Sequence, residues 1–213
     1  MASNRLVPHG GYVPFALAAT ALLLVVARKV DHLSWEAIGL DRRDLPRGLR
    51  WGGALAGLVL LTLLVGYLLP PTHDLFLDGR VRDLGIGGML TALFVRVPLG
   101  TVVLEEVAFR GVLPAALALR LKVWQAVGIS ALAFGLWHVL PALGLQHVNP
   151  VADDTVGHLP EWVTVAGAVL STAAVGVFFS WLRLRSRSLL TPMLLHWSTN
   201  SFGYLFAWLA WNR

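Results

Sequence analysis

The chain contains no cysteine and has few charged residues. Of its 213 residues, only 14% are Asp, Glu, Lys or Arg, whereas 56% are hydrophobic. The lack of cysteine excludes disulfides, thiolate catalysis and zinc sites with Cys ligands. A soluble domain of this length would have about one quarter charged residues, so the composition excludes an ordinary soluble domain.

Long apolar runs take the place of the missing charge. Mean hydropathy is +0.68, and several runs reach the ~18–20 residues that cross a bilayer. The candidate spans are residues 13–27, 51–69, 88–121, 123–143, 161–182 and 189–211. They predict an all-α polytopic membrane helix bundle of about six transmembrane helices. We expect a single integral membrane domain over residues 1–213.

The run 88–121 is too long for one ordinary span, because it would form about 50 Å of helix. Pro98, Gly100, Gly111 and Pro114 are places where this helix can bend or break. If the run divides, the bundle has up to about eight transmembrane helices.

The net charge of +5 would suggest a nucleic-acid partner in a soluble protein. Here the basic residues collect in short loops at 28–50, 120–122 and 183–187, whereas the loop 144–160 has no Lys or Arg. The positive-inside rule explains this pattern better. We therefore expect no nucleic-acid partner, basic loops in the cytoplasm and both termini outside.

A few polar side chains interrupt the apolar runs. An ionisable residue at the centre of a membrane helix costs about 2.5–3.5 kcal/mol, so such residues usually mark function. The main ones are Glu105, Glu106, Arg110, His138, His196 and Asn200. Because they cannot face lipid cheaply, we expect them to meet in a polar cavity inside the bundle.

The spacing of these residues supports the same expectation. Glu106 and Arg110 lie at i and i+4, which favours an ion pair, and His196 and Asn200 share a helix face in the same way. Glu105 is turned about 100° from Glu106. The two carboxylates therefore point in different directions, and Glu105 is left free for a separate task.

Three motifs in order resemble one family of membrane enzymes. They are Glu105-Glu106-x-x-x-Arg110, Phe134-x-x-x-His138 and His196-x-x-x-Asn200. On successive membrane helices this set resembles the CPBP family, the CAAX-type and bacteriocin-processing intramembrane endopeptidases also called the Abi family. The resemblance covers residues 98–205, the expected catalytic core, and implies a protease whose site is buried in the bundle.

The resemblance also implies a role for each residue. Glu105 is the general base that activates water, and His138 helps to hold that water. His196 and Asn200 polarise the scissile carbonyl and hold the oxyanion. Glu106 and Arg110 form a supporting ion pair. A positioned base supplies about 10²–10⁴-fold acceleration. One oxyanion donor supplies about 10²–10³-fold.

The cofactor requirement stays open at this point. Glu105, His138 and His196 have the donor types that bind zinc with an open fourth position. The same residues can act without a metal, as a glutamate-type hydrolase, and the H-E-x-x-H helix of zincins is absent from the sequence.

The substrate is expected to be a hydrophobic or lipidated peptide or protein in the bilayer, and the membrane a bacterial cytoplasmic membrane. The alternatives are a non-catalytic bacteriocin-immunity or peptide-binding membrane protein, or a small transporter. Trp137 and Trp197 are expected to line the cavity, and Arg96 to snorkel or to pair with an acidic residue outside it. Counted along straight helices, His196 lies ~10 Å and His138 ~22 Å from the cytoplasmic side, so they meet only if helices tilt or break.

Overall fold

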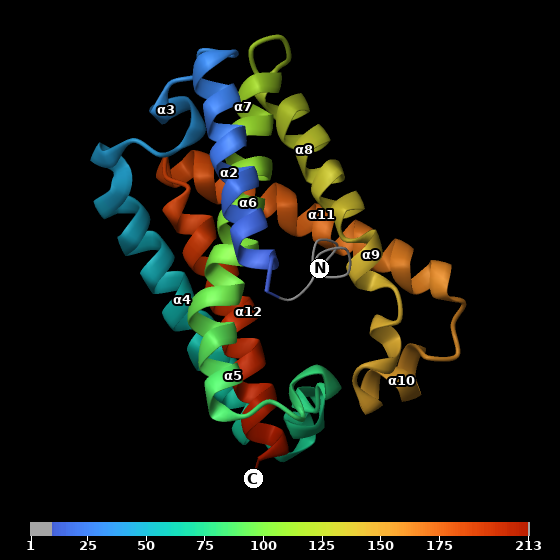
Figure 1. Cartoon of the computed structure of the whole chain (residues 1–213). Coiled ribbons are helices and arrows are strands. Elements are labelled where there is room, and N and C mark those ends of the chain that lie inside the picture. The colour runs from blue at the N-terminus through green and yellow to red at the C-terminus, as the bar shows by residue number, and fades with distance from the viewer. Residues whose placement is uncertain (1–9, 213) are drawn as a thin grey trace.

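The computed structural model describes residues 10–212, which form a bundle of helices without a strand in that range (Figure 1). The α-helices are α2 (Tyr12–Lys29), α3 (Trp35–Ile38), α4 (Leu45–Leu68), α5 (Ile86–Thr91), α6 (Val103–Glu106), α7 (Leu113–Leu117), α8 (Val123–Trp137), α9 (Val139–Ala142), α10 (Pro150–Val156), α11 (Glu161–Ser186) and α12 (Leu190–Trp211). This confirms the expected all-helical class.

Four helical segments are long and apolar enough to cross a bilayer. They are Tyr12–Lys29, Arg42–Leu68, Ile86–Leu117 and Glu161–Ser186. Helix α12 has a comparable length of 22 residues, but the polar residues 196–201 lower its hydropathy. The chain is an integral membrane protein, and one of its long helices, α12, carries several polar side chains.

Helix α8 is shorter than the expected span 123–143, because it ends at Trp137 after 15 residues. At 1.5 Å per residue this is about 22 Å, less than the ~30 Å hydrocarbon core. The cause is local: the His138 ring contacts the Phe134 carbonyl through Nδ1 at 2.8 Å. The backbone amide of His138 then donates to Gly135 instead, at 3.0 Å, and the regular helix stops.

The long run does not divide. It forms one continuous helical rod from Ile86 to Leu117, in which two π-helical segments, Ala92–Val102 and Val107–Val112, flank the single turn α6. Pro98 lies inside the first of them. π-helical geometry is rare in proteins and is often found at functional sites, and here two such segments enclose the turn that carries both glutamates.

Helices approach one another most closely at glycines. A Cβ on Gly52 of α4 would lie 2.7 Å from Leu194 Cδ1 of α12. A Cβ on Gly135 of α8 would lie 2.6 Å from the Val169 carbonyl oxygen of α11. Small residues allow this backbone contact between membrane helices. They hold α12 on α4, and α8 on α11, which runs obliquely across the bundle in Figure 1.

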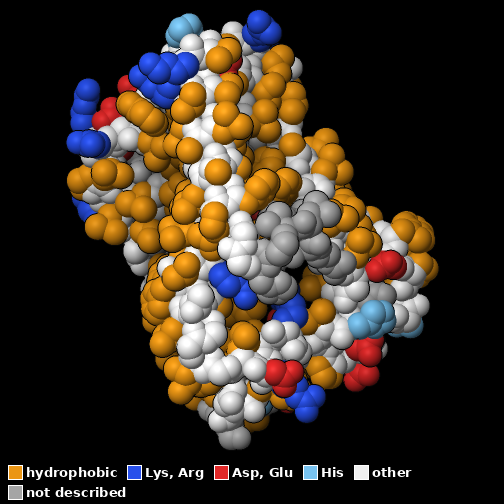
Figure 2. Space-filling view, viewed as in Figure 1, with side chains coloured by type: hydrophobic (Ala, Val, Ile, Leu, Met, Phe, Trp, Pro, Cys, Tyr) orange, Lys and Arg blue, Asp and Glu red, His pale blue; other side chains and the backbone are white. Residues whose placement is uncertain are grey.

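The loops separate by charge as the sequence predicts. Helix α3 and the α7–α8 turn lie at one end of the bundle, whereas α10 and the C-terminal end of α12 lie at the other (Figure 1). Most of the basic side chains visible in Figure 2 gather at the first end. Which end faces the cytoplasm stays a prediction of the positive-inside rule.

Candidate active site

Glu105 and Glu106 occupy the middle of the rod, in the single α-helical turn α6. Only 2% of Glu105 and 0% of Glu106 is exposed. Two buried carboxylates on adjacent residues need separate partners, because burial of an unpaired charge is strongly unfavourable. Their surroundings therefore define what each can do.

Glu106 is held by two partners. Its Oε1 lies 3.2 Å from Arg110 Nη1, which is the ion pair expected from the i, i+4 spacing. The same oxygen lies 2.7 Å from Nδ1 of His196 on α12. Glu106 thus joins the rod to α12 and fixes the orientation of the His196 ring.

Arg110 is enclosed by aromatic rings rather than by further hydrogen bonds. Its guanidinium carbon lies 3.7 Å from the centroid of Phe134 and 5.1 Å from that of Phe179. Both terminal nitrogens are buried without a hydrogen-bond partner. Cation–π attraction stabilises a desolvated guanidinium by about 2 kcal/mol or more. This contact gives Phe134, the first residue of the second motif, a physical role beside the charged cluster.

Glu105 has one oxygen held and one oxygen left open. Its Oε1 accepts a hydrogen bond from the indole Nε1 of Trp137 at 2.9 Å. Its Oε2 is buried without a hydrogen-bond partner and lies 3.9 Å from Nε2 of His196. Trp137 was expected only to line a cavity, and its direct contact with Glu105 is a feature that the sequence does not reveal.

His138 takes a defined tautomer from its position at the end of α8. The Phe134 carbonyl can only accept, so the ring nitrogen Nδ1 facing it at 2.8 Å is the donor. In the neutral ring Nε2 is then an acceptor. A ring held in this way presents one fixed nitrogen to its surroundings.

A cavity of about 680 Å³ lies between the rod, α12 and the α8–α9 junction. We call it the central cavity. It is lined by Tyr12, Arg80, Leu84, Ala92, Arg96, Val97, Thr101, His138, Pro141, Ala142, Leu145, Ala168, Thr172, His196, Asn200 and Tyr204. His138, His196 and Asn200 therefore meet around one space, so the difference in depth counted along straight helices does not keep them apart in the bundle.

Two sequence expectations at this site are wrong. Arg96 lines the central cavity, and within residues 10–212 it has no ion pair with an acidic side chain. Neither Trp137 nor Trp197 lines that cavity. The Trp137 indole donates to Glu105, and the Trp197 indole donates to the Leu93 carbonyl of the rod at 2.9 Å. The sequence signal for Arg96 is only that it lies in the same apolar run as the glutamates, and this does not say whether it faces lipid or the cavity.

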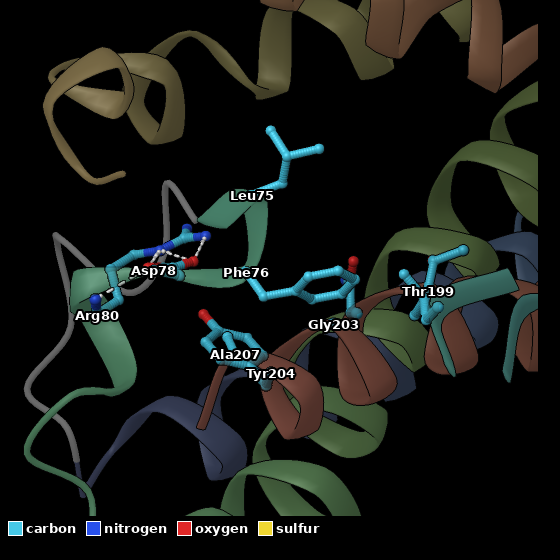
Figure 3. Close-up of a pocket in the computed structure, with 10 residues that line it drawn as sticks. Leu75, Phe76, Asp78, Arg80, Thr199, Gly203, Tyr204 and Ala207 are labelled. Atoms are coloured by element: carbon cyan, nitrogen blue, oxygen red, sulfur yellow. Dashed lines mark hydrogen bonds and ion pairs between the residues drawn. The ribbon is translucent and has the colours of Figure 1, made fainter. Parts of the chain in front are cut away.

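A smaller pocket of about 350 Å³ shares Arg80, Asn200 and Tyr204 with the central cavity. Figure 3 shows it with Arg80 bound to Asp78. The Arg80 Nη2 and Nε atoms lie 2.5 and 3.0 Å from Asp78 Oδ2. These hydrogen bonds raise the pKa of Arg80 above its ordinary value, so Arg80 is a fixed cation whose charge is already matched.

Glu105, His138 and His196 are the candidate ligands should a metal bind, and the cofactor requirement stays open. Among residues 10–212, no group of three or more His, Cys, Asp or Glu side chains is placed to hold a metal ion. Nδ1 of His196 contacts Glu106 and Nδ1 of His138 contacts a backbone carbonyl.

The fold and these contacts define a class: an integral membrane protein with a buried carboxylate–histidine cluster beside a polar cavity. Residues 87–211, more than half of the chain, match the family model described as Type II CAAX prenyl endopeptidase Rce1-like. The chain therefore belongs to this family, which confirms the resemblance to CPBP intramembrane proteases. Comparisons with curated proteins and with solved structures give no match.

Proposed function

We propose that this protein is an intramembrane endopeptidase in which Glu105 activates the attacking water. One observation carries the proposal: Trp137 holds Oε1 of Glu105, while Oε2 is buried without a partner and faces His196. A carboxylate oxygen that is aimed but unsatisfied is what a general base needs.

The 3.9 Å gap between Glu105 Oε2 and His196 Nε2 is too long for a direct hydrogen bond. A water oxygen beside the gap can reach both atoms at ordinary hydrogen-bond distances. Glu105 takes a proton from this water while the water oxygen attacks the scissile carbonyl carbon. The proton then passes to the leaving amine, and the free Nε2 of His138 helps to hold the water.

Asn200 is suited to stabilise the oxyanion that forms. His196 can do the same when its ring carries both protons, because Nδ1 donates to Glu106 and Nε2 can donate to the oxyanion only when it is also protonated. The two residues lie at i and i+4 on α12 and both line the central cavity. The Asn200 amide supplies two N–H donors, and fixed donors directed at a developing oxyanion are worth about 10²–10³-fold in rate. Glu106 and Arg110 act behind them, because they orient His196 and keep the rod against α12.

We propose that the substrate is a hydrophobic or lipidated peptide segment, and that the protein resides in a bacterial cytoplasmic membrane. A cavity of about 680 Å³ falls in the ordinary range for sites that enclose a ligand. The family name points to prenylated CAAX peptides as the first substrates to test.

The test compares the wild type with Glu105→Gln in nanodiscs. The substrates are a defined library of 14-residue peptides and a farnesylated CAAX peptide, with products identified by mass spectrometry. Glu105→Gln should lower the cleavage rate by about 10²–10⁴-fold without loss of folding, because its amide oxygen still accepts from Trp137. Full activity in Glu105→Gln would contradict the mechanism.

The matched control is Glu161→Gln, which removes the same charge from the start of α11 and should leave the rate unchanged. We also propose that these side chains act without a metal. In that case the chelator o-phenanthroline should leave the rate unchanged. Inhibition that zinc reverses would overturn that part. Peptides that bind to the wild type but stay uncut would instead favour a peptide-binding protein.

A further inference from the structure

The central cavity has the opposite charge from the cluster beside it. The rod places Glu105 and Glu106 together, but no Asp or Glu lines the cavity among the described residues. Two arginines do line it, Arg80 and Arg96. An arginine inside a membrane protein usually faces an acidic partner or a functional cavity. The role of each of these two arginines therefore depends on which acidic side chain, if any, pairs with it.

Arg80 already has its partner. Its guanidinium forms several hydrogen bonds with Asp78, as Figure 3 shows. It also lies 5.7 Å from the centroid of the Tyr204 ring. Its charge is therefore matched from within the chain, and it serves to build the wall of the cavity.

Arg96 has no such partner. In residues 10–212 no hydrogen bond or ion pair joins its side chain to an acidic group. The side chain is half-buried and lines the central cavity. It is thus an unmatched cation that faces the space where we place the substrate.

The distance along the bundle places this cation relative to the site of cleavage. Arg96 precedes Glu105 by nine residues on the same rod, which is at most about 14 Å. On α12, the residues His196, Asn200 and Tyr204 line the cavity at intervals of four, or about 6 Å each. The cavity thus extends from the histidine end to an arginine end.

We propose that Arg96 binds a carboxylate of the peptide substrate, within about four residues of the scissile bond. The limit follows from the ~14 Å above and the ~3.3 Å rise of an extended peptide. A guanidinium fits a carboxylate through two parallel hydrogen bonds. The carboxylate belongs either to the peptide C-terminus or to an Asp or Glu side chain. This assignment rests on the proposed function.

The experiment uses matched peptides from the same library, each made as a C-terminal free acid, as a C-terminal amide, and as an amide with one Asp moved through the four positions on each side of the cut. The wild type should prefer one carboxylate-bearing form by about ten- to a hundredfold. The free acid as the preferred form identifies the C-terminus as the source. A preference for one Asp position identifies a side chain.

Variants connect the preference to Arg96. Arg96→Gln should abolish it, and Arg96→Lys should keep part of it, since lysine keeps the charge but not the fork of donors. The control is Arg82→Gln, an exposed arginine over Trp211 outside the cavity, which should keep the full preference. Equal cleavage of acid and amide forms by the wild type, or a preference that survives in Arg96→Gln, would overturn the inference.

A binding measurement separates this inference from the proposed function. The same peptides are titrated onto the uncleaving Glu105→Gln protein and onto Glu105→Gln with Arg96→Gln. If Glu105→Gln binds the carboxylate-bearing peptides more tightly and the double variant does not, the Arg96 site is supported even if the wild type cleaves no peptide. If cleavage requires Glu105 but its rate does not depend on a carboxylate in the peptide, the Arg96 inference is wrong and the proposed function stands.

Discussion

The candidate site has two halves that differ in packing. In the rod cluster (Glu105, Glu106 and Arg110), each residue is at most 2% exposed and contacts residues from other helices. In the central cavity, Asn200 and Arg96 are half-buried and face open space. His196 belongs to both, because it contacts Glu106 and lines the cavity.

The contrast indicates a division of labour. A packed, charged cluster is costly to break but fixes geometry, because each member is held by the others. An open polar surface contributes little to folding and is free to contact water and substrate. Substitutions that break the buried Glu106–Arg110 pair of the rod cluster should therefore reduce stability, whereas those in the cavity should reduce activity alone.

Glu106→Ala should have the largest effect. It leaves Arg110 buried without its counter-charge and His196 without the partner of Nδ1. Breaking a buried pair by removal of one partner costs about 3–5 kcal/mol, so we expect this loss in the free energy of unfolding. Tryptophan fluorescence during denaturant unfolding in detergent micelles measures it.

The double variant Glu106→Leu with Arg110→Met sharpens the same prediction. A buried pair replaced by apolar side chains often recovers stability, so the double variant should unfold near the wild-type midpoint. It should still cleave slowly, since His196 has lost its orienting carboxylate. Wild-type stability of Glu106→Ala would show that the cluster is not the packed half described above.

Asn200→Ala should have the next largest effect. It changes the central cavity, so we expect a loss of activity rather than of stability. Loss of one oxyanion donor lowers kcat by about 10²–10³-fold, while stability changes by at most about 0.5 kcal/mol. Initial rates on the best library peptide, with unfolding measured in parallel, test both parts. A stability loss as large as that of Glu106→Ala would contradict the division between the halves.

Much of the rod cluster could be predicted from sequence because its signal is local. Charged residues are rare in an apolar run, so Glu105, Glu106 and Arg110 stand out. Their i, i+4 spacing then gives the ion pair directly. The helical class and most helix positions follow equally from the length and composition of the runs.

The contacts between helices could not be predicted in the same way, because they join residues distant in sequence. Trp137 meets Glu105 across 32 positions. The end of α8 depends on the side chain of His138 competing for the Phe134 carbonyl. From the sequence, Arg96 could equally face lipid or a cavity. Only the packed structure shows that it lines the central cavity.

Trp137→Phe should have the smallest effect and tests the boundary between the halves. Phenylalanine keeps an aromatic ring near Phe109 but leaves Oε1 of Glu105 without its donor. A hydrogen bond to a charged group is worth about 1.5–3 kcal/mol, so kcat should fall by about ten- to a hundredfold with KM little changed, as expected for a group that orients the base. The matched control is Trp197→Phe, which removes an indole donor from a backbone carbonyl of the rod rather than from the base. If both variants lower kcat equally, the effect comes from packing, and Trp137 does not position Glu105.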